Sequence, residues 1–153
     1  MITLSPVIPG RRSAEELREL AFDANARLDR APAERIVEWA ADEFGERFCV
    51  TSSMADAMLA HVVSRVIPGV PVVFLDTGLH FAETLRVRDL VARTLPVKVI
   101  SATPRQTVGQ QDGQHGPRLF ARNPDECCAL RKVEPLSRAL EPYDAWAAGL
   151  RRD

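Results

Sequence analysis

The sequence of 153 residues lacks most of the features that would place it in a special class of protein. Its three cysteines are an odd number, too few for a disulfide framework, which favours a reducing compartment. A formal net charge of −1 gives no basis for a nucleic-acid partner. No apolar run approaches membrane-spanning length, and the first ten residues lack the basic and apolar regions of a signal peptide. We therefore expect a soluble cytoplasmic protein.

The composition that remains, 46% hydrophobic and 27% charged, is ordinary for a single globular domain. Residues 1–12 hold two prolines and a glycine and are interpreted as a loose leader before a domain at 13–153. Ser13 and Glu16 form a capping-box pattern ahead of apolar residues at helical spacing up to Leu28. A second helix is expected from about Pro32 to a stop at Gly45.

Beyond Gly45 the pattern alternates between short apolar runs and helical segments. Strands are expected at 48–51, 70–75, 97–102 and 144–149, and helices at 56–67, 81–95 and 125–140, the last interrupted at Pro135. The stretch 103–123 is expected to be a mobile loop with one helical turn near Val108. This alternation predicts an α/β fold, a doubly wound, mainly parallel sheet with helices on both faces.

Small and polar residues follow two of the expected strands. Ligands bind outside the carboxyl ends of parallel strands, so Ser52, Ser53 and Asp56 after the first strand are candidates for anion binding. An ordinary helix cap explains them equally well. After the second strand, Gly78 permits close backbone approach, while Asp76 and Thr77 supply side-chain hydrogen bonds; the alternative is a local turn in which Asp76 bonds to nearby backbone. His80 is interpreted as a packing or capping residue rather than a catalyst.

The adjacent cysteines Cys127 and Cys128 stand among charges of both signs. A disulfide between neighbours would strain the intervening peptide, whereas the cationic Arg131 and Lys132 favour thiolates suited to metal ligation or redox chemistry. The alternative is two small residues buried on a helix. Lys132 shares a helix face with Cys128, unless it is simply a solvated charge. Cys49, within the first strand, is expected in the core, whereas Cys127 and Cys128 are expected side by side at a helix start and at the surface.

Four motifs together carry a family resemblance. They are Thr51-Ser-Ser-Met-Ala-Asp56, Phe74-Leu-Asp-Thr-Gly-Leu-His80, Glu126-Cys-Cys-x-x-x-Lys132 and Gly149-Leu-Arg-Arg152. In this order they resemble the assimilatory adenylyl-sulfate reductases, the cysteine-pair branch of the phosphoadenylyl-sulfate reductase family, from about Ser13 to the last residue. The resemblance implies a three-layer fold of the adenine nucleotide alpha hydrolase type. It also implies reduction of adenylyl sulfate to sulfite and AMP, with thioredoxin as electron donor, in sulfate assimilation and cysteine biosynthesis.

The resemblance also assigns roles to residues. Cys127 and Cys128 would be two of the four ligands of a 4Fe–4S cluster, and Lys132 would support catalysis near cluster and substrate. The substrate-binding set would be Ser52, Ser53, Asp56, Leu75, Asp76, Thr77, Gly78, Lys132, Gly149, Arg151 and Arg152. The family's later Cys-x-x-Cys and its terminal nucleophilic cysteine have no counterpart here, so no catalytic nucleophile is assigned. The chain therefore resembles the N-terminal and central part of the reductase domain, and we expect no turnover from it alone.

Three alternatives to reduction of adenylyl sulfate remain open at this point. The first is reduction of the 3′-phosphorylated nucleotide, although the cysteine pair favours the unphosphorylated form by resemblance. A truncated, inactive fragment that binds adenine nucleotide is the non-enzymatic alternative. An ATP-pyrophosphatase-type enzyme is disfavoured because Met54 and Ala57 replace a Gly and a Ser of that class's Ser-Gly-Gly-x-Asp-Ser motif.

Overall fold

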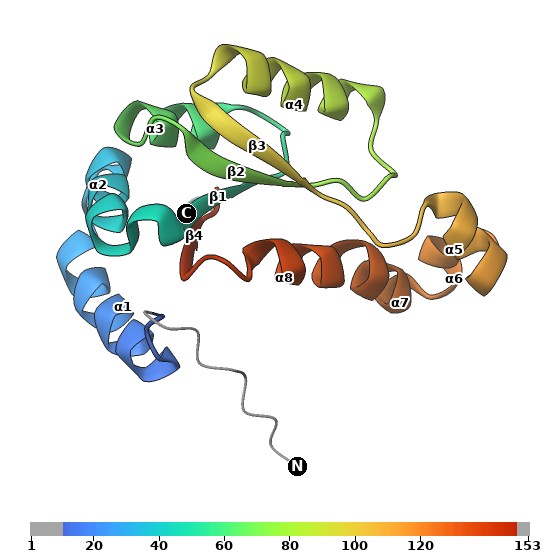
Figure 1. Ribbon diagram of the computed structural model, residues 1–153, viewed down its shortest axis with the longest axis horizontal. Coiled ribbons are helices and arrows are strands. Elements are labelled where there is room, and N and C mark those ends of the chain that lie inside the picture. Colours follow the sequence, from blue (N-terminus) through green and yellow to red (C-terminus); the bar gives the residue numbers. More distant parts are fainter. Residues whose placement is uncertain (1–10, 150–153) are drawn as a thin grey trace.

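The computed structural model describes residues 11–149 (Figure 1). Its strands are β1 (Phe48–Ser52), β2 (Val70–Leu75), β3 (Val97–Ala102) and β4 (Ala145–Ala147). Its α-helices are α1 (Ala14–Leu28), α2 (Ala33–Phe44), α3 (Met58–Val66), α4 (Ala82–Thr94), α5 (Val108–His115), α6 (Leu119–Arg122), α7 (Pro124–Cys128) and α8 (Glu134–Leu140). A short 3₁₀ turn, Gly45–Arg47, precedes β1, and a π-helical turn, Ala129–Val133, joins α7 to α8.

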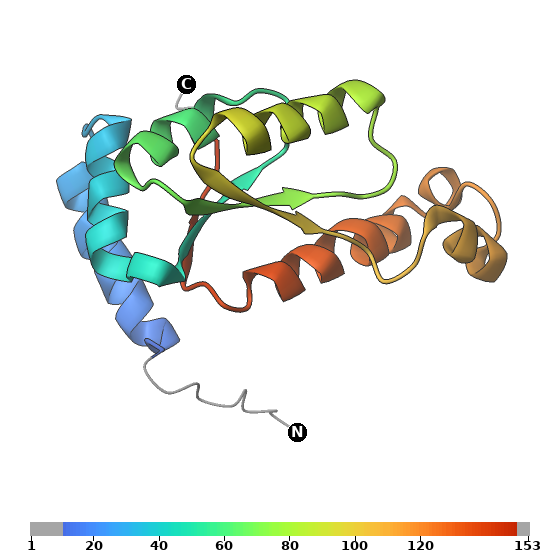
Figure 2. The same cartoon turned by 45° about the horizontal axis from the view of Figure 1, so that its top comes forward.

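The four strands form one parallel sheet in the order β3-β2-β1-β4. Val50 pairs with Val72 of β2, and Phe48 pairs with Ala145 of β4. The chain steps outward from β1 to β3 and then returns to lay β4 on the other side of β1 (Figure 2). The direction of winding therefore reverses between β1 and β4, which is where doubly wound sheets bind their ligands.

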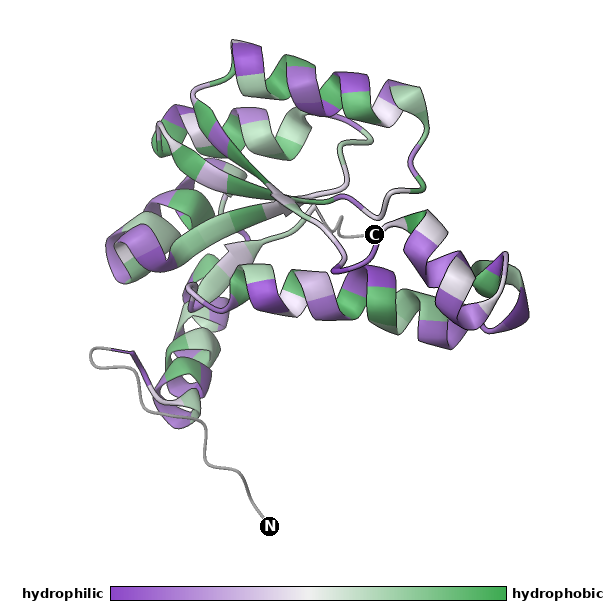
Figure 3. Cartoon of the chain, turned by 45° about the vertical axis from the view of Figure 1, so that its right-hand side comes forward, coloured by the Kyte–Doolittle hydropathy of each residue, from purple (hydrophilic) through white to green (hydrophobic). Residues whose placement is uncertain are grey.

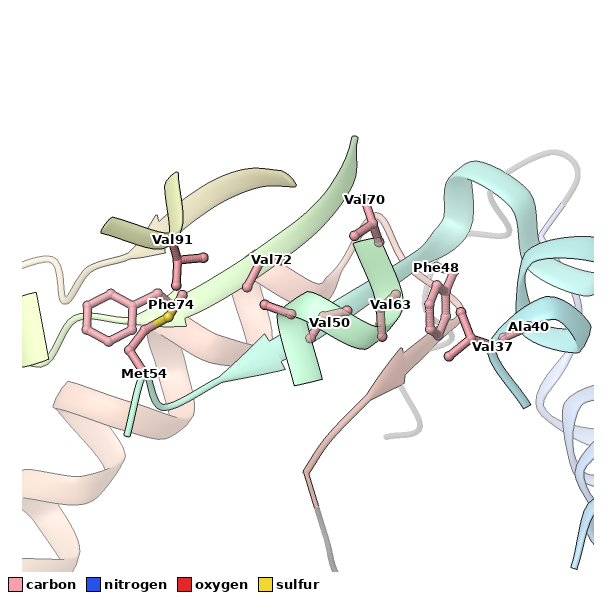
Figure 4. Close-up of a cluster of buried hydrophobic side chains, with 11 residues drawn as sticks. Val37, Ala40, Phe48, Val50, Met54, Val63, Val70, Val72, Phe74 and Val91 are labelled. Atoms are coloured by element: carbon pink, nitrogen blue, oxygen red, sulfur yellow. The ribbon is translucent and has the colours of Figure 1, made fainter. Parts of the chain in front are cut away.

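Alternate residues of the strands supply two separate cores. Successive side chains of a strand point to opposite faces. Val50, Val72 and Phe74 lie on the face covered by α2, α3 and α4 (Figure 4). Cys49 and Val73 belong to the other core, which is completed from β3 and α8 by Ala102, Leu136, Ala139 and Leu140. Helices on both faces give the three layers that the sequence predicts.

The local signals read from the first two helices are confirmed. The Ser13 side chain accepts a hydrogen bond from the backbone of Glu16, whose carboxylate accepts one in return from the Ser13 backbone. Gly45 ends α2 with a φ of 52°, a conformation that suits glycine. The outer helix α4 shows the mixed hydrophilic and hydrophobic banding of a helix with one buried side (Figure 3). No helix within residues 11–149 is long and apolar enough to cross a membrane.

Two expectations are wrong. Residues 103–123 are not a loop, because α5 and α6 lie within them, and a capping box between Thr107 and Gln110 begins α5. The helix at 124–140 is not interrupted at Pro135; instead its winding widens to a π-helical turn directly before the proline. In a regular α-helix the ring of Pro135 would clash with the carbonyl of Arg131.

Two elements are also shorter than expected. Helix α3 begins at Met58 rather than Asp56, and β4 ends at Ala147 rather than Gly149. Residues 1–10 of the expected leader lie outside the described residues, as do Arg151 and Arg152.

Candidate functional site

The turn after β1 is built around an unusual backbone conformation. Met54 has a φ of 56°, and its side chain is only 1% exposed, packed in the core with Phe74 (Figure 4). The Met54 N–H donates to Ser52 Oγ at 3.2 Å. Asp56 accepts a hydrogen bond from the Met58 N–H at 3.0 Å, so its carboxylate closes a local turn at the start of α3. Met54, which stands where the Ser-Gly-Gly-x-Asp-Ser motif has a glycine, thus adopts a conformation that suits glycine.

The turn after β2 is held by local hydrogen bonds. Asp76 accepts from the Gly78 N–H at 3.0 Å and forms an ion pair with Arg88 at 3.4 Å. Thr77 Oγ1 accepts from the Leu79 N–H at 3.3 Å. Asp76 therefore forms the expected local turn and is paired with Arg88, and its role in substrate binding stays a prediction.

His80 packs against the end of β2, as the sequence indicates. Its Nε2 lies 2.8 Å from the carbonyl oxygen of Leu75, and its ring stacks on Phe74 with the centroids 5.0 Å apart. The resemblance places adenine beside the Leu75 backbone. In the structure the Leu75 carbonyl already has a partner in His80.

The cysteine pair lies on α7, which Asn123 caps by accepting a hydrogen bond from the Glu126 N–H. Cys128 is partly exposed, whereas Cys127 is only 6% exposed, so the expectation that both thiols reach the surface is wrong for Cys127.

A cavity of about 420 Å³ lies beside α7. Its lining includes Cys127, Cys128 and Lys132 from the cysteine-bearing helix and Thr77, Leu79 and His80 from the turn after β2. Lys132 is exposed and shares the cavity with Cys128, as their spacing predicts. The structure therefore brings the turn after β2 and the cysteine pair together.

Ser52 and Ser53 end the neighbouring strand at the same edge of the sheet, because β1 and β2 are parallel. The hydroxyl of Thr51 donates to the carbonyl of Ala147 at 3.3 Å, which ties the end of β1 to the end of β4. Gly149 follows β4 two residues later. The serines are therefore near the reversal of winding, separate from the lining of the cysteine cavity.

Arg131, which the sequence indicates only as a cation beside the cysteine pair, has a second role that the sequence does not reveal. It is only 3% exposed, and its Nε donates to the carbonyl of Thr77 at 2.6 Å. Its Nη1 donates to the Gln111 side chain at 3.1 Å and to the Gln106 carbonyl at 3.3 Å. An arginine beside a lysine is normally a solvated charge, and only the folded chain places it under the turn after β2.

The chemistry of the thiols separates Cys49 from the pair. Burial raises the pKa of Cys49 to about 12, which keeps it an inert core thiol. Cys127 and Cys128 are suitable thiolate donors on one cavity wall. Within residues 11–149 no group of three or more His, Cys, Asp or Glu side chains is placed to hold a metal ion. The pair therefore fits as part of a thiolate ligand set rather than as a complete one.

Residues 47–153 match the phosphoadenosine phosphosulfate reductase domain. The chain belongs to this family. The family's curated relatives include proteins named adenosine 5′-phosphosulfate reductase. The protein from Streptomyces coelicolor is 58% identical over 142 residues, which are 93% of this chain and 60% of the relative. The protein from Mycolicibacterium smegmatis is 50% identical over 137 residues, 90% of this chain and 58% of the relative.

The protein of the same name from Mycobacterium tuberculosis is 44% identical, with 93% of this chain and 63% of the relative covered. The chain thus spans about 60% of the length of these relatives. A crystal structure of phosphoadenylyl-sulfate reductase from Candida auris, in a phosphate complex, superposes with a TM-score of 0.70 at 23% identity. The match covers 94% of this chain and 70% of that one. The adenine nucleotide alpha hydrolase-like fold is confirmed.

Proposed function

We propose that this chain forms the nucleotide-binding and cysteine-pair part of an enzyme that reduces adenylyl sulfate to sulfite and AMP. The observation that carries the proposal is the shared cavity of Thr77, Cys128 and Lys132 at the carboxyl edge of a doubly wound sheet. The names of relatives at 44–58% identity support the same substrate. Thioredoxin as electron donor and a cytoplasmic location belong to the proposal through the family resemblance.

The two ends of the substrate would bind at two parts of the carboxyl edge of the sheet. The adenylyl group would lie along the ends of β1 and β2, beside Ser52, Ser53 and Leu75, with Gly149 and Arg152 next to them. Thr77 and Lys132 would meet the anionic end, where an ammonium offsets charge on the transferring group. In the family reaction a cysteine thiolate attacks the sulfate sulfur, AMP leaves with the bridging oxygen, and a thiosulfonate forms. A thioredoxin thiolate then releases sulfite and leaves a disulfide.

Cys127 and Cys128 would hold two of the four thiolate positions of a 4Fe–4S cluster. When bound, the cluster would fix both cysteines as thiolates and add its charge to the cavity that Lys132 lines. The sulfur-attacking role is assigned to none of the chain's three cysteines. Cys49 is buried in the core, and the pair would be occupied as ligands.

Calorimetric titration tests the proposed substrate. Adenylyl sulfate should bind more tightly than adenosine, because Lys132 and the turn at Thr77 contact only the anionic end. It should also bind more tightly than the 3′-phosphorylated nucleotide. Clearly tighter binding of the 3′-phosphorylated form, or equal binding of adenosine, would contradict the proposal.

A nucleotide-binding chain without turnover is the second candidate, and the assignment of all three cysteines to other roles favours it for this chain alone. Incubation with adenylyl sulfate, thioredoxin and a reductant should give no sulfite above a control without protein. Sulfite formation that Cys127→Ser or Cys128→Ser abolishes would give the pair a nucleophilic role instead.

A further inference from the structure

Arg131 joins three parts of the chain that lie far apart in the sequence. Its Nε bonds to Thr77 in the turn after β2, across 54 residues. Its Nη1 bonds to Gln111 on α5 and to the Gln106 carbonyl just before that helix. Arg131 itself lies in the π-helical turn that follows the cysteine pair. One side chain thus links the turn after β2, the start of α5 and the cysteine-bearing helix.

The environment of this guanidinium is unusual for a buried charge. Arg131 is 3% exposed, and none of the ion pairs found within residues 11–149 includes it. Its partners are two backbone carbonyls and one side-chain amide oxygen. Buried charges are normally paired with an opposite charge or fully hydrogen-bonded. Here three hydrogen bonds to uncharged oxygens take the place of an ion pair. An ammonium cannot reproduce that planar fork.

Gly78 shows how closely the turn and the guanidinium fit. Its φ is 73°, and a Cβ built there would lie 2.9 Å from Nη2 of Arg131. The absence of a side chain at Gly78 therefore lets the turn rest on the guanidinium. Arg131 also lines both the cysteine cavity and the neighbouring cavity of about 460 Å³ beside Gly78. It forms part of the wall between them.

We infer that Arg131 is a positioning residue that sets the separation between the turn at Thr77–Gly78 and the cysteine pair. Thr77 and Cys128 line the same cavity, and Arg131 is bonded to the first and lies three residues beyond the second. The importance of this separation rests on the proposed function, because the anionic end of the substrate would lie between the turn and the cysteine pair. The arrangement itself does not depend on the substrate.

The experiment compares Arg131→Gln, Arg131→Lys and Gln111→Leu with the unmodified chain. Arg138→Gln is the matched control, since Arg138 also donates from α8 to a backbone carbonyl, that of Thr103, away from the cysteine cavity. Alkylation of native protein, mapped by mass spectrometry, measures access to Cys127 and Cys128. Hydrogen exchange measures protection of the turn at residues 76–80 and, as an internal reference, of β1. Titration with adenylyl sulfate and with adenosine measures binding.

In Arg131→Gln we expect alkylation of Cys127 to accelerate by at least about tenfold, because the turn that lines the same cavity loses its bond to Arg131 and opens more often. Exchange should rise at residues 76–80 while β1 remains protected. Arg131→Lys should behave like Arg131→Gln, since the charge stays but the fork is lost. Gln111→Leu should give a smaller change in the same direction, and Arg138→Gln should give none.

Several outcomes would overturn the inference. Arg131→Lys equal to the unmodified chain would assign the effect to charge, and a uniform rise in exchange that includes β1 would make Arg131 a general stability residue. Unchanged Cys127 alkylation in every variant would remove the positioning role. If Arg131→Gln does not fold, Arg131→Lys and Gln111→Leu decide by the same criteria. If the unmodified chain fails to bind adenylyl sulfate, the proposed function falls, while alkylation and exchange still decide the inference.

Discussion

The Nε2 atom of His80 lies 2.8 Å from the carbonyl oxygen of Leu75, five residues earlier in the chain. The same ring stacks on Phe74, so His80 fixes the end of β2 through one polar and one apolar contact. His80→Ala should lower the free energy of unfolding by about 2 kcal/mol, and His80→Phe, which keeps a ring, by about 1 kcal/mol. Urea denaturation measures both. Equal losses for the two variants would show that stacking contributes nothing.

Met54 combines a left-handed backbone with a buried side chain. The backbone conformation favours glycine, whereas the buried position favours a large apolar side chain. Met54→Ala removes the packing against Phe74 and keeps the backbone strain, so it should cost about 3 kcal/mol of stability. Met54→Gly loses the same packing but relieves about 1 kcal/mol of strain. The glycine variant should therefore be at least as stable as the alanine variant, the reverse of the usual order. Thermal or urea unfolding of the two proteins makes the comparison.

Helix α5 depends on its cap because two glycines, Gly109 and Gly113, lie within it. Thr107 Oγ1 accepts from the Gln110 N–H at 3.2 Å, and the Gln110 side chain accepts from the Thr107 N–H at 2.9 Å. Thr107→Ala should cost about 1 kcal/mol and raise hydrogen exchange across residues 108–115. Thr107→Ser keeps the acceptor and should leave exchange unchanged. Loss of protection in both variants would assign the effect to the Thr107 methyl group.

Much of the fold follows from the sequence because its signals are local. The apolar runs at 70–75 and 97–102 and the capping box at Ser13 predict β2, β3 and the start of α1 correctly. The region 103–123 suggests a loop because glycines and glutamines there outweigh the capping signal at Thr107 and Gln110. That capping box is the sequence feature that predicts α5, by the same rule that succeeds at Ser13.

The candidate site is predictable only where its residues belong to a strand end or to a local spacing. Thr77 follows a strand, and Lys132 follows Cys128 by one helical turn, so both are found from the sequence. The structural role of Arg131 is not predictable from the sequence, because it depends on Thr77 and Gln111, which are 54 and 20 residues away. No local pattern distinguishes a buried guanidinium bound to carbonyls from a solvated one.

The buried thiol of Cys49 should make stability depend on pH in alkaline solution. Burial raises its pKa from 9.0 to about 12, so below pH 9.0 both folded and unfolded states keep the proton. As the pH rises from 9.0 towards about 12, the unfolded chain ionises first, and the free energy of unfolding falls. Cys49→Ala should remove part of this decline, measured by urea denaturation across the alkaline range.

Two features of the chain sharpen that measurement. The pKa of Tyr143 is also raised, mainly by burial and to a lesser extent by the nearby Cys49. A smaller alkaline decline in the free energy of unfolding should therefore persist in Cys49→Ala. Cys128→Ala keeps the buried thiol and should retain the full decline. An identical pH dependence in Cys49→Ala and the unmodified chain would show that the pKa of Cys49 is the same in the folded and unfolded chain.

Lys132 should contribute to binding only through the anionic end of a nucleotide. It is exposed at the rim of the cysteine cavity, where an ammonium gains a few tenths to about 1 kcal/mol against a partly solvated anion. Lys132→Gln should therefore weaken adenylyl sulfate about threefold to fivefold at low salt and leave adenosine unchanged. The chain's other lysine, Lys98, is exposed on β3 near the opposite end of the sheet, beside Gly69 and Pro71, and provides the control. Lys98→Gln should leave both affinities unchanged. Equal weakening by the two substitutions would mean that Lys132 acts only through net charge and has no place in the cavity's recognition of the sulfate.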